Sequence, residues 1–173
     1  LSVARLCEQK RVDRLIYAFS EVVRDYPNLW LVLVGDGILG EELKNLAEKL
    51  GVSKYIKFLG SKEDAVDYYK ASDIYVLSSD NEGFARVTME AIAAGLITVA
   101  TTVPGANEAI CDGVNGFLVD KSVEGVRDGL IKALKLTKEQ GESMAIEARK
   151  KIVENFSLEE RAKETLRFMG IGE

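Results

Sequence analysis

Short runs of β-branched and other apolar residues alternate with segments of helical periodicity up to about residue 120 of this chain. This alternation is typical of βαβ units, in which parallel strands form a sheet and the connecting helices cover its faces. The run LWLVLVG at residues 29–35 is apolar almost throughout, as a strand buried on both faces must be. The sequence therefore predicts an α/β fold, a Rossmann-like doubly wound parallel sheet of about six strands with a C-terminal helical tail.

The boundaries of these elements follow from periodicity and turn residues. The predicted strands cover residues 1–6, 29–35, 55–60, 74–78 and 96–101, with a last strand after the turn within residues 111–119. Helices are predicted over residues 12–24, up to residues 50–51, near 64–70, over 85–94, and near 106–110 after a turn at Pro104-Gly105. From residue 123 the pattern is helical only, with a break at residues 155–156 and a capping box formed by Ser157 and Glu160. Because the chain begins inside an apolar strand, we expect one domain of a longer protein.

Composition argues against several classes of function. The 173 residues carry a formal net charge of −5 and no histidine, and the two cysteines, Cys7 and Cys111, lie far apart. An acidic chain lacks the basic surface that non-specific nucleic-acid binding needs, and a zinc site is not expected without histidine. No apolar run approaches the roughly 18 to 20 residues of a membrane helix. We therefore expect a reduced, cytosolic protein without a metal site or a nucleic-acid partner.

The motif GDGILG at residues 35–40 matches the G-x-G-x-x-G pattern of dinucleotide-binding proteins. However, it follows the second strand, and the next strand ends in KFLGSK, without the acidic residue that would hold a ribose. Two interpretations stay open: a dinucleotide site, or a tight strand-to-helix turn that uses glycine's backbone freedom and brings Gly35 close to a ligand. We favour the turn.

Ligands of doubly wound sheets bind outside the carboxyl ends of the strands, so the loops there are the candidate sites. Arg5, Lys10 and Arg11 surround the loop after the first strand. Their cations suit a phosphate or diphosphate, although three charges near a loop are also what a solvated surface shows. A weaker candidate is Glu108 in VPGANEAI, which more simply stabilises the start of a short helix.

The segment NEGFARVTME at residues 81–90 holds the most informative acidic residues. If a helix begins near Ala85, the amides of Phe84, Ala85 and Arg86 are unpaired and can bind an anion. Glu82 then lies in the loop before the helix and Glu90 more than one turn inside it, so they could hold different parts of one elongated ligand. The alternatives are a helix-stabilising acid at Glu82 and an exposed charge at Glu90. Because EAIAAG consists mostly of small residues, we expect a crowded position for Glu90.

Several segments together resemble one enzyme family. EGFARVTME resembles the E-x7-E arrangement of the retaining GT-B glycosyltransferases of the large group 1 family. Five further segments follow that family's order and spacing: VARLCEQKRVDRLIYAF, LVLVGDG, IKFLGSKEDAVDYYKASDIYVLSS, AIAAGLITVAT and NEAICDGVNGFLV. The resemblance covers nearly the whole chain. It implies that residues 1–173 are one Rossmann-like donor-binding domain, the C-terminal half of a GT-B fold, without the N-terminal acceptor domain.

The resemblance also implies a role for each candidate residue. Arg5 and Lys10 would bind the donor diphosphate, and Glu82 would orient the donor sugar, so that these three residues would act in catalysis. Glu90 would accept hydrogen bonds from the ribose hydroxyls. Other substrate contacts would come from Gly35, from Gly60 and Ser61 near the base, and from Gly83, Phe84, Ala85 and Arg86 near the sugar.

The chain departs from the family pattern at a few places. Ala4-Arg5-Leu6 replaces Gly-Arg-Leu, Lys10-Arg11 replaces Lys-Gly, Ala85 replaces the glycine after Phe84, and Gly95-Leu96-Ile97 replaces Gly-x-Pro. Arg11 and Ala85 add bulk near the expected site, so the choice of donor does not carry over from the family.

The implied function is retaining transfer of a hexose from a UDP-, GDP- or ADP-sugar to a glycan or lipid acceptor held by the N-terminal domain. No cofactor is expected, and without an Asp-x-Asp pair no metal is expected either. The isolated domain should transfer nothing, and the full-length protein should be cytoplasmic, with peripheral attachment to the inner face of the membrane as the alternative. The rivals are a non-catalytic or dinucleotide-binding Rossmann module and another GT-B enzyme, such as a nucleotide-sugar epimerase or a phosphorylase.

Overall fold

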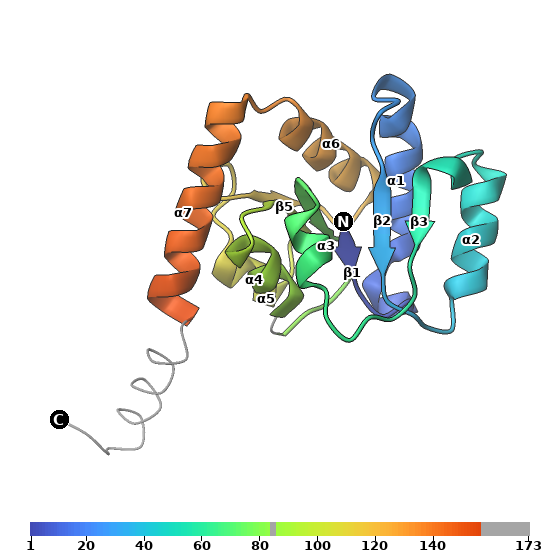
Figure 1. The fold of residues 1–173 in the computed structure, drawn as a ribbon, viewed down its shortest axis with the longest axis horizontal. Coiled ribbons are helices and arrows are strands. Elements are labelled where there is room, and N and C mark those ends of the chain that lie inside the picture. Colours follow the sequence, from blue (N-terminus) through green and yellow to red (C-terminus); the bar gives the residue numbers. More distant parts are fainter. Residues whose placement is uncertain (84–85, 157–173) are drawn as a thin grey trace, which may run out of the picture.

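The computed structural model describes residues 1–83 and 86–156 of the chain. Strands and helices alternate along most of it, as Figure 1 shows. The strands are β1 (Ser2–Val3), β2 (Leu31–Val34), β3 (Ile56–Phe58), β4 (Ile74–Leu77), β5 (Ile97–Thr101) and β6 (Phe117–Val119). The helices are α1 (Val12–Asp25), α2 (Gly40–Lys49), α3 (Val66–Lys70), α4 (Arg86–Ala93), α5 (Pro104–Ala109), α6 (Val123–Leu134) and α7 (Lys138–Phe156). The short 3-10 helices are η1 (Glu8–Lys10) and η2 (Ser53–Tyr55).

The strands pair in parallel within two three-stranded sheets, β1-β2-β3 and β4-β5-β6. The sheets meet at Leu1, whose amino group donates to the carbonyl of Ile74 at 2.8 Å. The amide of Val76 in turn donates to the Leu1 carbonyl at 2.9 Å. The strand order across the molecule is therefore β3-β2-β1-β4-β5-β6, the order of a doubly wound Rossmann-like sheet. The predicted α/β class is confirmed, with two short sheets that meet at Leu1 in place of one continuous sheet.

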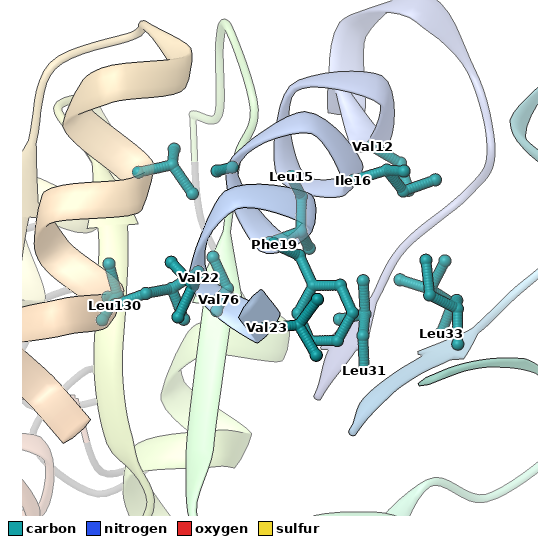
Figure 2. Close-up of a cluster of buried hydrophobic side chains, with 14 of the residues drawn as sticks. Val12, Leu15, Ile16, Phe19, Val22, Val23, Leu31, Leu33, Val76 and Leu130 are labelled. Carbon is teal, nitrogen blue, oxygen red and sulfur yellow. The ribbon is translucent and has the colours of Figure 1, made fainter. Parts of the chain in front are cut away.

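Helix α1 covers the junction between the two sheets. Its apolar residues recur at helical spacing, so one face of the helix is buried. In Figure 2, Phe19 of α1 joins one buried cluster with Leu31 of β2, Val76 of β4 and Leu130 of α6. Because α1 begins directly after residue 11, this packing fixes the end of the loop that follows β1.

Helix α6 lies close on the second sheet. A Cβ atom at Gly129 would lie 2.6 Å from the Cγ1 atom of Val99 in β5 and 2.7 Å from that of Val119 in β6. Real Cβ atoms hardly ever approach so closely, so the helix can lie at this distance only with glycine. The first helix of the predicted tail is thus a layer of the core. Helix α7 packs against α4 and α5 (Figure 1), and none of the described helices is long and apolar enough to cross a membrane.

Three of the differences between the predicted and the observed boundaries bear on the fold. β1 is shorter than predicted because the chain after it bends over the end of β2, where the Leu6 amide donates to the Asp36 carbonyl at 2.9 Å. The Pro-Gly pair at residues 104–105 begins α5 and is not a separate turn, since proline suits the first turn of a helix. Helix α7 includes residues 155–156, where a break is predicted, and the predicted capping box at residues 157–160 lies outside the described residues.

Candidate functional site

The strand order reverses between β1 and β4, and a doubly wound sheet has its binding crevice at such a point. From β1 the chain continues through α1 to β2 on one side, and from β4 it continues through α4 to β5 on the other side. The loops after these strands, residues 4–11 and 78–83, therefore flank the crevice. Among the residues that they contain are Lys10 and Glu82, which therefore lie where the topology places a ligand.

The two loops are hydrogen-bonded to each other. The Ser78 hydroxyl donates to the Lys10 carbonyl at 2.9 Å. The Asp80 amide donates to the Gln9 carbonyl at 2.9 Å, and the Gln9 side chain donates to the Asn81 carbonyl at 2.8 Å. The loop after β4 therefore takes its shape from contacts with the loop after β1, although the bonded residues are 68 to 72 positions apart.

Lys10 and Glu82 form an ion pair between the two loops. The Ser79 hydroxyl donates to the same carboxylate oxygen at 2.8 Å, and Thr101 in β5 donates to the Ser79 carbonyl at 2.6 Å. The Gly105 amide in α5 donates to the Glu82 carbonyl at 2.9 Å. Glu82 is only 9% exposed, and Lys10 and Ser79 supply the partners that a buried carboxylate requires. The structure thus brings together two residues that the sequence assigns to adjacent parts of one ligand.

Arg11 is bound to other carboxylates and takes no part in this pair. Its backbone has a φ of 47° and a ψ of 45°, a left-handed conformation that residues other than glycine seldom adopt. Its guanidinium donates to both carboxylate oxygens of Asp13, at 3.1 and 3.0 Å, and to Asp80 at 3.2 Å. Burial alone would raise the pKa of each aspartate, but hydrogen bonds from arginine outweigh it and lower both pKa values. Because Arg11 is occupied by two carboxylates, the predicted group of three cations is reduced to Arg5 and Lys10.

Glu90 lies on an exposed face of α4, so the prediction of a crowded position is wrong. Of the four residues that follow, 91–92 are buried, whereas 93–94 lie on the same face as Glu90 and are exposed. The hydroxyl of buried Tyr69 donates to Oε2 of Glu90 at 3.1 Å. Burial and the negative charge of Glu90 raise the pKa of Tyr69, so the phenol stays protonated and remains a donor.

Four other predicted residues lie in the loops at the carboxyl ends of the first sheet. Arg5 is exposed in the loop after β1. The Gly35 amide donates to the Gly60 carbonyl at 2.8 Å, so the chain segments that leave β2 and β3 meet there. Ser61, which follows, is exposed. These positions leave the predicted base site open to solvent.

Helix α4 begins at Arg86 in the described part of the chain. Both Arg86 and Gly83, in the preceding loop, are exposed. The other two predicted sugar contacts, Phe84 and Ala85, lie outside the described residues. The anion site at the start of this helix therefore stays a prediction.

Close approach of two chain segments explains the glycines of GDGILG. A Cβ atom at Gly35 would overlap the carbonyl oxygen of Ala4, and the φ of Gly35 is 133°. A Cβ atom at Gly37 would lie 2.7 and 2.8 Å from the backbone carbon and nitrogen of Leu6. The motif follows β2, one strand away from the point where the order reverses. These contacts favour the tight-turn interpretation over a dinucleotide site.

Sequence reasoning missed the residues that support the site. Arg14 is 4% exposed and donates to the Ser78 carbonyl at 2.8 Å and to Oδ1 of Asp80 at 2.6 Å. Tyr69 supports Glu90 from 21 positions away. Such partners are distant in the sequence, and no local spacing reveals them. Ser79 was missed as well, although it lies only three residues before Glu82 in the same loop.

Comparisons with known proteins agree with one another. The family model described as glycosyl transferases group 1 matches residues 1–155. The chain is 37% identical over 123 residues to an uncharacterized glycosyltransferase of Haemophilus influenzae, covering 70% of this chain and 35% of that protein. The solved structure of Anabaena HepE in complex with UDP and glucose has a TM-score of 0.83 and 26% identity, covering 96% of this chain and 47% of that one. The C-terminal domain of LpcC, a glycosyl transferase group 1 family protein from Francisella tularensis, has a TM-score of 0.81 and 25% identity, covering 91% of this chain and 85% of that one.

Proposed function

This chain belongs to the glycosyl transferases group 1 family, and from that premise we propose that its crevice binds the nucleoside diphosphate sugar donor of a retaining glycosyltransferase. The observation that carries the proposal is the Lys10–Glu82 pair at the point where the strand order reverses. A cation and an acceptor for hydroxyl groups lie side by side there, as a ligand with a diphosphate next to a sugar requires.

The diphosphate binds to Lys10 and Arg5 in this proposal. The Lys10 ammonium has three donors and exchanges its carboxylate partner for phosphate oxygens. As the bond between the anomeric carbon and the diphosphate oxygen breaks, negative charge grows on that oxygen and both cations stabilise it. The acceptor hydroxyl bonds to the anomeric carbon on the same face and gives its proton to the departing phosphate oxygen, so the configuration is retained.

The sugar and the nucleoside bind to the two glutamates. Once Lys10 turns to the diphosphate, Glu82 can accept hydrogen bonds from the donor sugar while Ser79 still holds one of its oxygens. Glu90 accepts hydrogen bonds from the ribose hydroxyls, and Tyr69 keeps its carboxylate oriented. The base lies near Gly60 and Ser61, at the exposed end of β3.

The remaining parts of the reaction lie outside this chain. The chain spans about a third of the length of the curated relatives that it matches. We place the glycan or lipid acceptor on a further domain, so that the 173 residues bind the donor without transferring the hexose. The full-length enzyme is cytoplasmic in this proposal, with or without peripheral attachment to the inner face of the membrane.

Calorimetric titration of the chain with UDP, GDP and ADP, in the presence of EDTA, tests the proposal. UDP comes first, because the similar HepE structure contains it. One of the three should bind, and Glu90→Ala should weaken its affinity by at least about tenfold, because a hydrogen bond to a charged group contributes about 1.5 to 3 kcal/mol. Glu108→Ala, which removes an exposed carboxylate from α5, is the control and should bind like the parent. Failure of all three nucleotides to bind, or equal losses in both variants, would contradict the proposal.

Glu82→Gln offers a sharper test, because two ligands should respond differently. The neutral amide releases Lys10 from its ion pair, so UDP should bind more tightly than to the parent. The affinity for UDP-glucose should rise less than the affinity for UDP, or should fall, since the amide is a poorer acceptor for the sugar hydroxyls. If both affinities change by the same factor, Glu82 does not contact the sugar.

A further inference from the structure

We infer that Arg14 and Asp80 are positioning residues of the donor site, which hold the loops of Lys10 and Glu82 at a fixed separation. This inference rests on the proposed function. Neither residue is among those assigned to the ligand. Their contacts join the loop after β4 to the start of α1 and to the loop after β1.

The Arg14 guanidinium donates hydrogen bonds on both sides of Ser79, the residue that supports Glu82. Its Nη1 donates to the Ser78 carbonyl at 2.8 Å, and its Nη2 donates to Oδ1 of Asp80 at 2.6 Å. Ser79, whose hydroxyl holds the Glu82 carboxylate, lies between these two contacts. Because α1 is packed into the hydrophobic core, the guanidinium ties this short segment to a core helix.

Asp80 has contacts to several chain segments at once. Its Oδ1 accepts from Arg14, and its Oδ2 accepts from Arg11 at 3.2 Å. Its amide donates to the Gln9 carbonyl at 2.9 Å, and its carbonyl accepts from Lys121, between β6 and α6, at 2.7 Å. Asp80 cannot move without breaking contacts to each of these segments. These contacts fix the direction of the chain after Asp80. They therefore also restrict the position of Glu82, two residues later.

Burying the Arg14 guanidinium costs free energy, so we infer that its main contribution is to orient its hydrogen-bond partners. Taking a guanidinium out of water is unfavourable, and well-packed apolar residues often replace a buried ion pair without loss of stability. Arg14 is 4% exposed, whereas its partner Asp80 is partly exposed, so the pair itself is weak evidence for stability. A planar fork with fixed donor directions, in contrast, orients two acceptors in a way that no apolar side chain can.

The test compares Asp80→Ala, Asp80→Asn and Asp13→Ala in calorimetric titrations with UDP and UMP. UMP lacks the terminal phosphate of UDP, so the ratio of the two affinities reports the diphosphate contacts. Asp80→Ala should weaken UDP binding roughly tenfold, since a small misplacement of a binding group has large effects, and should change UMP binding much less. Asp80→Asn keeps an acceptor for Arg14 and should recover most of the loss. Asp13→Ala removes the other partner of Arg11 without touching the loop after β4, so both affinities should stay as in the parent.

Equal loss of UDP and UMP affinity in Asp80→Ala, or an equal effect of Asp13→Ala, would overturn the inference. Hydrogen exchange of the ligand-free chain tests the inference independently of the proposed function. In Asp80→Ala, the Gly105 amide, which donates to the Glu82 carbonyl, should exchange at least about tenfold faster, with amides of α6 unchanged. Unchanged exchange at Gly105 overturns the inference, whereas a parent chain that binds neither UDP nor UMP overturns the proposed function.

Discussion

The substitution Gly35→Ala should destabilise the fold strongly, because it adds both backbone strain and overpacking at this position. Its φ of 133° lies where L-residues rarely occur, and the added Cβ would overlap the Ala4 carbonyl oxygen and lie 2.9 Å from the carbonyl carbon. Backbone strain costs about 1 to 2 kcal/mol, and overpacking adds about 1 to 3 kcal/mol. The sum of about 2 to 5 kcal/mol should lower the Tm of a chain of this size by roughly 4 to 20 °C.

Two other glycines separate these costs. Gly51 has a φ of 72° and nothing within 4 Å of an added Cβ, so Gly51→Ala measures strain alone, about 1 to 2 kcal/mol. Gly37 is not among the positive-φ glycines, but its Cβ would lie 2.7 Å from the backbone carbon of Leu6, so Gly37→Ala measures overpacking, about 1 to 3 kcal/mol. Urea unfolding followed by far-UV circular dichroism should rank Gly35→Ala as the least stable of the three variants.

If Gly35→Ala and Gly37→Ala unfold at the same urea concentration as Gly51→Ala, the reasoning from chain packing is refuted. The glycines of GDGILG would then need another explanation, and the dinucleotide site is the first to consider. Titration of the parent chain with NADH decides that case, because binding enhances NADH fluorescence. We expect no enhancement.

Two further predictions concern side chains near the site. Tyr69→Phe removes the donor to Glu90 and should weaken nucleoside diphosphate binding by roughly threefold to tenfold, as measured by calorimetry. The pKa of Asp80 lies below its ordinary value of 3.8, because hydrogen bonds from Arg14 and Arg11 outweigh the effect of burial, which raises it. A lowered folded-state pKa gives stability that is complete above the unfolded value and is lost as pH falls through the folded value. Asp80→Asn should therefore be less stable than the parent at pH 7, and the difference in urea midpoint should shrink below about pH 4.

Much of the fold could be predicted because its signals are local. Helix α1 begins at Val12 as predicted and ends one residue later than predicted, because its apolar residues keep helical spacing along its length. The ends of strands were harder to predict. Residues 4–6 follow the apolar start of the chain, but β1 and β2 pair only as far as Val3 and Val34, and the close approach of Gly35 to Ala4 beyond that point is a tertiary contact. The single predicted sheet is split for a similar reason, since among the described residues the two sheets are joined by the backbone hydrogen bonds of Leu1 to Ile74 and Val76.

The sequence predicted which loops contain the site residues, but it did not predict which of these residues form ion pairs. Lys10 and Glu82 were each recognisable from their loops, yet their ion pair joins residues 72 positions apart. Arg11 looked like a third cation for the diphosphate. Its left-handed backbone, at the position where the family pattern has glycine, directs the guanidinium to carboxylates instead. Glu90 was expected to be crowded because its neighbours are small, but small residues on an exposed helix face bury nothing.

In the proposed function, the Lys10–Glu82 pair affects how strongly the donor binds. Glu82 is only 9% exposed, and in the free protein its carboxylate is paired with Lys10, the cation to which the proposal assigns the diphosphate. Binding then exchanges one anion for another at Lys10, and the free energy of the broken pair is subtracted from the affinity for the diphosphate alone. A complete nucleotide-sugar returns part of that free energy, because its hydroxyls give Glu82 new donors. The site should therefore favour the intact donor over the nucleoside diphosphate that remains after transfer, which promotes release of that product.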